Sequence, residues 1–205
     1  MKCLRIFAWF AGSLLPVSAG FASDWIEQPL KFDIQWPYDL KESERHTVKD
    51  GVHDFVVHKT DQTFRKGSPT LPRTEMRIEN DYTSGSHMFE ADVYVPAGTS
   101  GVSIMQIFGG SGRHASSLQL RVYQGDLKRY RAETVKSGIY DHWFHLNVAH
   151  DADTHKIVID IDGVPVLSAE DYGGSSHYFK CGVYTQEGAS DKTEVLFKNI
   201  KVYSK

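Results

Sequence analysis

The chain has 205 residues and a formal net charge of −3, with charges of both signs spread along its length. No basic run stands out, so the electrostatic footprint of a nucleic-acid-binding protein is missing and we expect no nucleic-acid partner. After removal of a leader, roughly 185 residues would remain, and a domain of ~150 residues already buries about two-thirds of its unfolded surface. We therefore expect a single domain with one core, and a monomer.

The first residues have the pattern of a secretory signal peptide. Two basic residues precede an uncharged, largely apolar run at 6–20 that is interrupted by a proline. This run is shorter than the ~20 apolar residues of a membrane helix. We predict a signal peptide at 1–19, with a cut after Ala19 or alternatively after Ala22, and one domain at 20–205. The product would be secreted and would not associate with a membrane after cleavage.

Cysteine and histidine usage limits disulfides and metals. Cleavage would remove Cys3 and leave Cys181 alone, so no intramolecular disulfide could form. Ten histidines are present, but His142 and His145 would face opposite sides of a strand, and no other pair has a metal-binding spacing. No contiguous loop supplies the oxygen ligands of a calcium site. The sequence therefore predicts neither a metal nor a cofactor.

Short strand candidates separated by turn residues dominate the chain. A strand is predicted at 52–58, after an extended segment at 24–40 that could pair as an edge strand, and a long loop follows at 59–72. Asp162-Gly163 is a strong hairpin signal. Further strands are predicted at 73–79, 88–95, 102–108, 117–123, 127–133, 143–150, 156–162, 164–169, 178–186 and 193–203. This pattern predicts an all-β jelly roll of two antiparallel sheets with a concave groove.

One face of the predicted strand at 178–186 is polar and aromatic. Successive strand side chains point to opposite faces, so five residues share this face. They are Tyr178, Lys180, Gly182, Tyr184 and Gln186. The opposite face is mostly apolar and belongs to the core. A glycine flanked by such side chains makes a suitable floor for a sugar ring, so we predict that this face lines a binding groove.

The strand at 73–79 places Arg73, Glu75 and Arg77 on one face. The planar guanidinium group matches a carboxylate, which favours an acidic ligand. The alternative is a ladder of cross-strand ion pairs on a solvated sheet. Arg121, on the polar face of 117–123, is a further candidate contact in the groove.

Three more residues are candidates with a structural alternative. Gln106 lies in an otherwise apolar strand, where an unpaired buried amide costs about 1–3 kcal/mol, so it either has a structural partner or points into the groove. His53 shares a strand face with Phe55 and Val57, which is typical of a packing position. His114 follows a glycine-rich loop and could lie over a site or remain exposed.

Three motifs, in chain order, resemble those of the alginate-lyase-type jelly rolls, polysaccharide lyase family 7 and the related glucuronan lyases. They are Arg73-Thr74-Glu75-Met76-Arg77, Gln106-Ile107-Phe108 and the segment 178–186. Further segments, among them Pro37-Tyr38-Asp39-Leu40 and Leu118-Gln119-Leu120-Arg121-Val122-Tyr123, look like the plant citrate-binding proteins, which share that fold.

The resemblance implies roles for the matching residues. Arg73 and Gln106 would hold and neutralise a uronate carboxylate, and Tyr184 would act as the acid and in some members also as the base. Residues expected to contact the substrate are Glu75, Arg77, Arg121, Tyr178, Lys180 and Gln186. The family 7 lyases usually have a histidine where this chain has Phe108. In a lyase the base would then be Tyr184, His53 or His114, and a tyrosine with an ordinary pKa near ~10 would need Arg73 or Lys180 beside it.

Two functions from different classes follow. The first is a secreted lyase that cleaves a β-linked polyuronate of the glucuronan or alginate type by β-elimination, with a glucuronan-like chain favoured because of Phe108. The alternative is a non-catalytic binder of a small carboxylate, such as citrate, or of an acidic glycan. The lyase predicts that Arg73, Gln106 and Tyr184 converge in an open groove, whereas the binder predicts the same groove with no base near Tyr184. A third possibility, a structural domain with a solvated polar face, fits the clustered charges less well.

Overall fold

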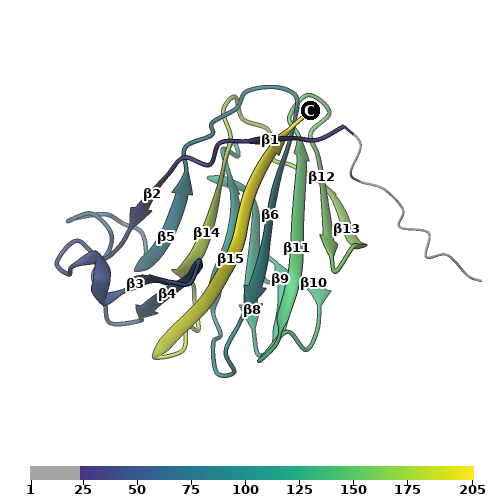
Figure 1. The fold of residues 1–205 in the computed structure, drawn as a ribbon. Helices are drawn as coiled ribbons and strands as arrows, with labels where there is room; N and C mark the ends of the chain where they lie inside the picture. Colours follow the sequence, from purple (N-terminus) through teal and green to yellow (C-terminus); the bar gives the residue numbers. More distant parts are fainter. Residues whose placement is uncertain (1–23) are drawn as a thin grey trace, which may run out of the picture.

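The structure, a computed structural model, describes residues 24–205, so the predicted signal peptide lies outside the described residues. Two antiparallel sheets form a sandwich (Figure 1). Sheet A has the order β13-β12-β11-β6-β15-β4-β3, with β1 also paired to β15. Its strands are β1 (Ile26–Gln28), β3 (His46–Lys49), β4 (Val52–His58), β6 (Ser86–Tyr94), β11 (Trp143–Asp151), β12 (Lys156–Ile161), β13 (Val164–Glu170) and β15 (Lys192–Ser204).

Sheet B has the order β10-β9-β8-β7-β14-β5-β2 and carries the three motifs of the resemblance. Its strands are β2 (Phe32–Gln35), β5 (Arg73–Ile78), β7 (Val102–Phe108), β8 (Ser116–Tyr123), β9 (Asp126–Arg129), β10 (Glu133–Lys136) and β14 (Tyr178–Thr185). One short 3-10 helix, η1 (Glu42–Glu44), precedes β3. The predicted all-β jelly-roll class is confirmed.

Turn chemistry explains where strands end. Asp162 and Gly163 both have positive φ, 54° and 76°, as a tight type I′ hairpin between β12 and β13 requires. The segment predicted as one strand at 127–133 is two strands, because Tyr130 has a φ of 52° and the chain turns there. The extended segment at 24–40 does pair, as β1 on β15 and β2 on β5.

The core lies between the sheets and is built from the apolar face of each strand. Phe55, Phe89 and Phe197 from sheet A meet Phe179 and Met76 from sheet B, and all five are shielded from solvent. Burying one such side chain contributes about 1.5–3 kcal/mol. Because inward positions are occupied by apolar residues, the alternate positions of sheet B face outward as a set.

Cys181 belongs to the same core. Its side chain is fully buried, and burial raises the pKa of its thiol well above the ordinary value. The thiol therefore stays protonated and unreactive at neutral pH.

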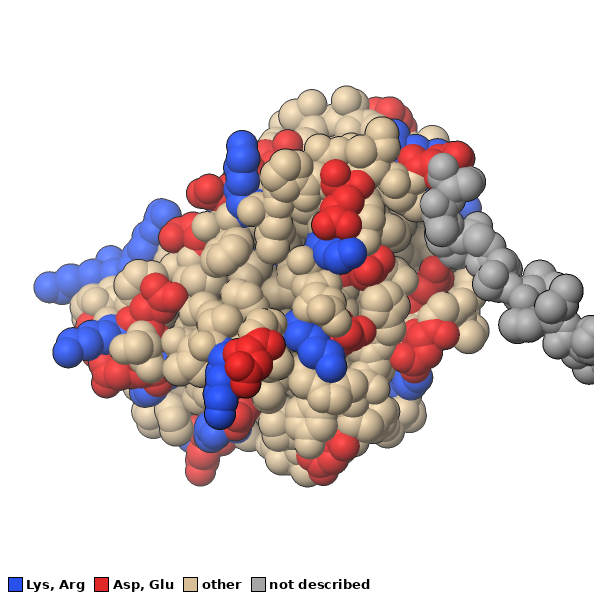
Figure 2. Space-filling model, viewed as in Figure 1, with Lys and Arg blue, Asp and Glu red and all other residues tan. Residues whose placement is uncertain are grey.

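The face of the molecule shown in Figure 2 carries basic and acidic side chains close together, without a large patch of one sign. The strand β15 crosses this face in Figure 1. A typical pair is Lys201 with Glu27, whose Nζ and Oε2 atoms are 3.1 Å apart. No helix within residues 24–205 has the length and apolarity needed to cross a membrane.

Candidate functional site

The outward face of sheet B gathers the predicted polar residues in rows. In the strand register Arg77 lies opposite Lys180, and Lys180 lies opposite Gln106. Gln106 in turn lies opposite Gln119 on β8. The pairing of β5, β14, β7 and β8 therefore brings together side chains that are up to about 100 residues apart in the chain.

Glu75 is the centre of this group. Its carboxylate is bonded by Nη1 of Arg73 at 3.0 Å and by Nζ of Lys180 at 2.6 Å, and it also accepts a very short hydrogen bond from Gln106. Glu75 is only 1% exposed. Burial alone would raise the pKa of Glu75, but Lys180 and Arg73 outweigh it and hold this pKa below its ordinary value. The structure thus buries an ionised Glu75 beneath the floor of the cavity described below, and Glu75 does not form part of the cavity wall.

Gln106 is held in a chain of amide hydrogen bonds. Its Oε1 accepts from Oγ of Ser116 and from Nε2 of Gln119, both at 3.0 Å. Gln119 accepts from Nε of Arg121 at 2.8 Å, so Arg121 reaches the cluster through this amide. With 2% exposure, Gln106 has the structural partners that a buried amide needs. Its orientation is therefore fixed before any ligand arrives.

Arg73 contacts aromatic rings on its remaining surface. The guanidinium carbon lies 3.8 Å from the centroid of the Tyr184 ring and 4.9 Å from that of Phe64. Nε of Arg73 is buried and has no hydrogen-bond partner among the described residues. The cation is thus held against Tyr184 by Glu75 on one side and by aromatic faces on the other.

A cavity of about 490 Å³ opens over this cluster, between the strands and the loop at 59–72. Four cations line it, and its aromatic walls are Phe64, Phe108 and Tyr178. The cations are Arg65, Lys66, Arg73 and Lys180. No Asp or Glu is among the described residues that line it. We call this space the cationic cavity; its chemistry suits a ligand with carboxylate groups and an apolar sugar face.

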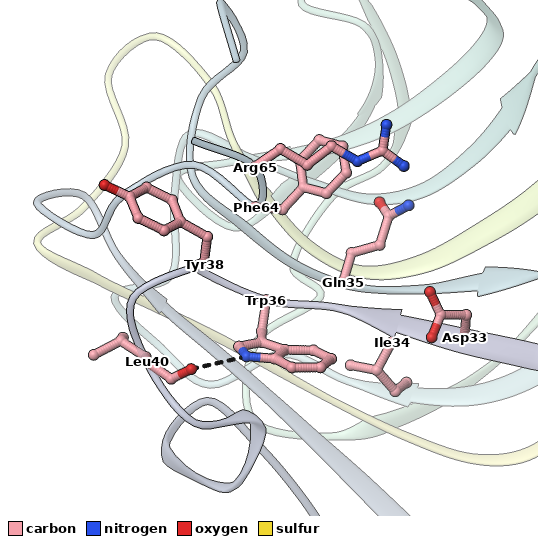
Figure 3. A pocket seen from close by; sticks show the side chains of 8 residues that line it. All are labelled: Asp33, Ile34, Gln35, Trp36, Tyr38, Leu40, Phe64 and Arg65. Carbon is pink, nitrogen blue, oxygen red and sulfur yellow. Dashed lines mark hydrogen bonds between the residues drawn. The ribbon is translucent and has the colours of Figure 1, made fainter. Parts of the chain in front are cut away.

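A second cavity of about 330 Å³ adjoins the first and shares Gln35, Phe64 and Arg65 with it (Figure 3). Trp36 stands in its wall, where Nε1 donates to the carbonyl oxygen of Leu40 at 3.0 Å. Gln35 accepts a hydrogen bond from Lys180 at 2.8 Å, which links the two cavities to the buried cluster. Together they extend the binding surface to the β2 edge of sheet B.

Phe108, where the resemblance implies a histidine in the family 7 lyases, belongs to an aromatic stack. The rings of Phe108 and Tyr178 stack with centroids 4.9 Å apart, and the guanidinium of Arg77 lies 4.0 Å above the Tyr178 ring. Nη2 of Arg77 donates to Asp81 at 2.7 Å. Arg77 therefore supports the wall of the cationic cavity from behind.

Three predicted residues are not brought to this cluster. His53 lies on β4 of sheet A and stacks on His46, while His114 stacks on Tyr172 with centroids 3.8 Å apart. Gln186 follows the end of β14 and donates to the carbonyl oxygens of Thr185 and Tyr184. Neither histidine is among the described residues that line the cationic cavity. Tyr184 is not among them either, but it adjoins the cavity through its contact with Arg73.

Four residues of the site were not singled out in the sequence. Phe64, Arg65 and Lys66 come from the loop at 59–72, and Gln35 comes from β2. The available signal was the length of that loop, together with an aromatic residue followed by two cations. Long loops without regular structure are often functional.

Gly182 makes the cluster possible, and its replacement by alanine tests this. Its φ is +131°, and a Cβ atom would lie 2.5 Å from the Thr74 carbonyl oxygen and 2.9 Å from Cα of Glu75. We expect Gly182→Ala to lower the free energy of unfolding by about 1–3 kcal/mol, because β5 must shift. Urea denaturation measures this. Gly188→Ala is the control, since Gly188 also has positive φ but open space around it; an equal loss in both variants would contradict the steric argument.

The chain is similar to known proteins over most of its length. A family profile described as alginate lyase matches residues 30–204. A citrate-binding protein of Hevea brasiliensis is 45% identical over 191 residues, which cover 91% of this chain and 80% of that protein.

Among solved structures, the alginate lyase AlgAT5 from polysaccharide lyase family 7 superimposes with a TM-score of 0.68 and 20% identity, over 85% of this chain and 94% of its own. A variant of the family 7 alginate lyase A1-II′, in complex with the substrate GGMG, gives a TM-score of 0.61 and 17% identity, over 77% and 80% of the two chains. At these identities the likeness shows the fold alone.

Proposed function

Because the chain belongs to the alginate lyase family, we propose that it binds a polyuronate through the sugar carboxylates and cleaves it by β-elimination, with Tyr184 as both acid and base. The observation that carries this proposal is the convergence of Arg73, Gln106 and Tyr184. Arg73 and Gln106 both bond to Glu75, and the same Arg73 lies on the Tyr184 ring. A glucuronan-type chain is the favoured substrate, with alginate next.

Charge supports the binding step. Glu75 is one carboxylate facing two cations, Arg73 and Lys180, while Arg65 and Lys66 make no ion pair within the described part of the chain. The cationic cavity therefore keeps a net positive charge that a uronate would neutralise. Neutralising that carboxylate lowers the cost of removing the proton from the neighbouring carbon five, since negative charge develops there.

The elimination needs one base and one acid. Tyr184, as phenolate, would take the carbon-five proton; the electron pair forms the double bond between carbons four and five as the bond from carbon four to the glycosidic oxygen breaks. The phenol then returns its proton to that oxygen. The Arg73 guanidinium lies over the Tyr184 ring, with its carbon 3.8 Å from the ring centroid. This scheme uses only groups that line or adjoin the cationic cavity.

A second candidate function is carboxylate binding without cleavage. Phe108 occupies the place of the family histidine, and no histidine is among the described residues lining the cavity. The 45% identical relative named as a citrate-binding protein supports this alternative. Such a binder would use the same four cations and would leave the bound carboxylate unchanged.

Ultraviolet absorbance separates the two functions, because β-elimination creates an unsaturated, absorbing chain end. The protein is incubated with glucuronan, alginate and pectate. We expect absorbance to rise on one polymer and the rate to fall by about 10²-fold or more in Tyr184→Phe, which removes the proton carrier. Tyr203→Phe, on sheet A, is the control and should keep the full rate.

No absorbance change on any polymer would overturn the lyase. If citrate or a polymer then still raised the melting temperature, the chain would be a carboxylate-binding protein. An unchanged rate in Tyr184→Phe would remove Tyr184 from the chemistry even if the protein proved to be a lyase.

A further inference from the structure

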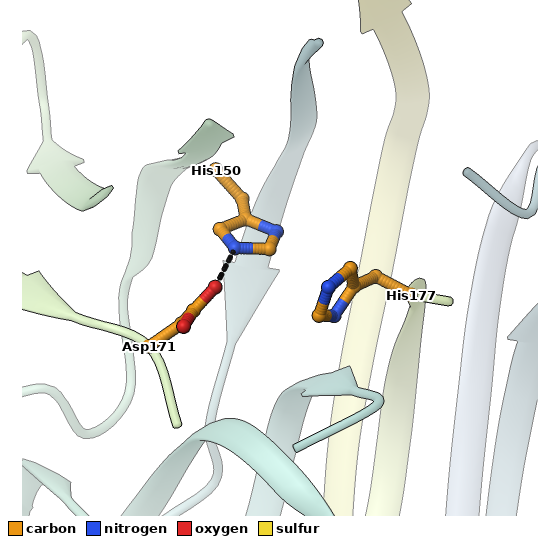
Figure 4. A group of neighbouring side chains, drawn as sticks. All are labelled: His150, Asp171 and His177. Atoms are coloured by element: carbon orange, nitrogen blue, oxygen red, sulfur yellow. Dashed lines mark hydrogen bonds and ion pairs between the residues drawn. The ribbon is translucent and has the colours of Figure 1, made fainter. Parts of the chain in front are cut away.

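A second cluster of functional side chains lies away from the cationic cavity, at the junction of β11 with the loop between β13 and β14. His150, Asp171 and His177 each offer one ligand atom, and these atoms lie within 4.8 Å of one another (Figure 4). His150 comes from β11, whereas Asp171 and His177 flank the loop. We propose that these three side chains bind a divalent transition-metal ion of the zinc type, which fastens this loop to sheet A.

The ligands are buried and held in place. The side chains of His150 and Asp171 are 0% and 1% exposed, and His177 is 1% exposed. Nδ1 of His177 is shielded from solvent, and within residues 24–205 no group meets it at full hydrogen-bond geometry, although backbone groups of Phe108 and Gly174 lie close to the ring. A metal ion would give a nitrogen of this buried ring a full bonding partner.

The donor set suits metal binding. Two imidazoles and one carboxylate are a set of donors that zinc takes in proteins.

The surrounding residues resemble the support that metal-binding histidines usually have. Nδ1 of His150 is 2.8 Å from the hydroxyl of Tyr82, which can either donate or accept. Nε2 of His150 can thus release its proton to become a ligand while Nδ1 gains one, without loss of the Tyr82 bond. Asp171 is oriented by the amide of Gly173 at 2.7 Å.

The required movement is small. Two ligands that each bond zinc at ~2.1 Å are ~3.4 Å apart in a tetrahedral site, so atoms that now lie within 4.8 Å of one another must approach by ~1.5 Å at most. His155, whose Nδ1 is 3.1 Å from Asp171 and whose side chain is 56% exposed, stands at the solvent side as a source of a fourth ligand. The ion would enter from that side.

Metal binding here would also stiffen one end of the cationic cavity. His177 directly precedes Tyr178, and its backbone pairs with Tyr82 in both directions. A Cβ atom on Gly109, which directly follows Phe108, would lie 2.0 Å from the carbonyl oxygen of Ser176, so the two loops touch backbone to backbone. The metal would therefore fix the Phe108–Tyr178 stack from outside.

Zinc titration tests the site without any activity measurement. The full chain is stripped of metal with a chelator, and zinc chloride is added while thermal unfolding is followed. We expect one zinc per chain and a rise in melting temperature of roughly 5–10 °C at ~100 times the Kd. His177→Gln should lose most of this rise, while His142→Gln, an exposed histidine outside the cluster, should keep it.

Cobalt chloride gives a second readout on the unaltered protein, in case His177→Gln fails to fold. Bound Co²⁺ with these ligands should show visible absorption bands that zinc abolishes. No rise in melting temperature with zinc, a full rise in His177→Gln, or a cobalt spectrum equal to that of the free ion would each overturn the metal site.

Discussion

Replacement of Glu75 by glutamine is expected to lower the free energy of unfolding by about 3–5 kcal/mol, since it leaves two buried cations without their shared anion. Lys180 is 3% exposed and Arg73 is 7% exposed, so water can hardly replace the lost carboxylate. Glutamine keeps the size of the side chain, and the loss would therefore report charge and not packing. Urea denaturation at pH 7 measures it.

Glu79→Gln is the matched control, because Glu79 follows the same strand but is exposed. It should change stability by less than about 0.5 kcal/mol. If Glu75→Gln were as stable as the wild type, other groups would have to stabilise the two cations, and Glu75 would not be their essential counter-ion.

The same substitution should remove a pH dependence. The pKa of Glu75 is lower in the folded chain than its ordinary value. Its contribution to stability is therefore fully present above the ordinary pKa of a glutamate, about 4.3, and is lost as pH falls through the lower folded value. The difference in stability between wild type and Glu75→Gln should accordingly shrink below pH 4.

Replacement of Phe108 by histidine is expected to raise the rate of β-elimination by about 10²-fold or more. Phe108 lines the cationic cavity, and the resemblance of its motif to the family 7 lyases implies a histidine at this position in those enzymes. An imidazole with an ordinary pKa near ~6.5 accepts protons at neutral pH, which a phenyl ring cannot do and a tyrosine with an ordinary pKa near ~10 does poorly. The initial rise in ultraviolet absorbance on the preferred polymer measures the gain.

A control variant and a pH–rate profile test this prediction further. Phe108→Leu removes the stack on Tyr178 without adding a base, so it should not increase the rate. The pH–rate profile of Phe108→His should gain an inflection near the imidazole pKa. A histidine variant no faster than the wild type would show that Tyr184 and the bound carboxylate, not the missing base, set the rate.

The fold and the face of the site followed from the sequence because both depend on local pattern. Alternation of side chains placed Arg73, Glu75, Lys180 and Tyr184 on one side of their strands, and the structure has them there. Turn residues located most strand ends to within two positions. Both patterns involve residues that are close in the sequence, so they can be interpreted without knowledge of the tertiary contacts.

The contact partners of each side chain could not be predicted from the sequence, because the order of the strands in the sheet decides them. Alternation could not show that Glu75 bonds to Lys180 and Gln106, since those residues lie on two other strands. The cluster of His150, Asp171 and His177 could not be predicted for the same reason. Its members have no metal-binding spacing in the sequence, and only the folding of the sheet and a loop brings them together. The sequence predicted the length of the loop at 59–72 but not which cavity this loop covers.

The strand β15 has a consequence for how the chain is made. It lies between β4 and β6 and pairs with both, although β4 was synthesised well over a hundred residues earlier. Until residues 192–204 emerge from the ribosome, both neighbours present open hydrogen-bonding edges, and contacts so distant in sequence form slowly. The nascent protein should therefore remain open and prone to association until β15 has been made, and its yield should depend on chaperones that shield those edges.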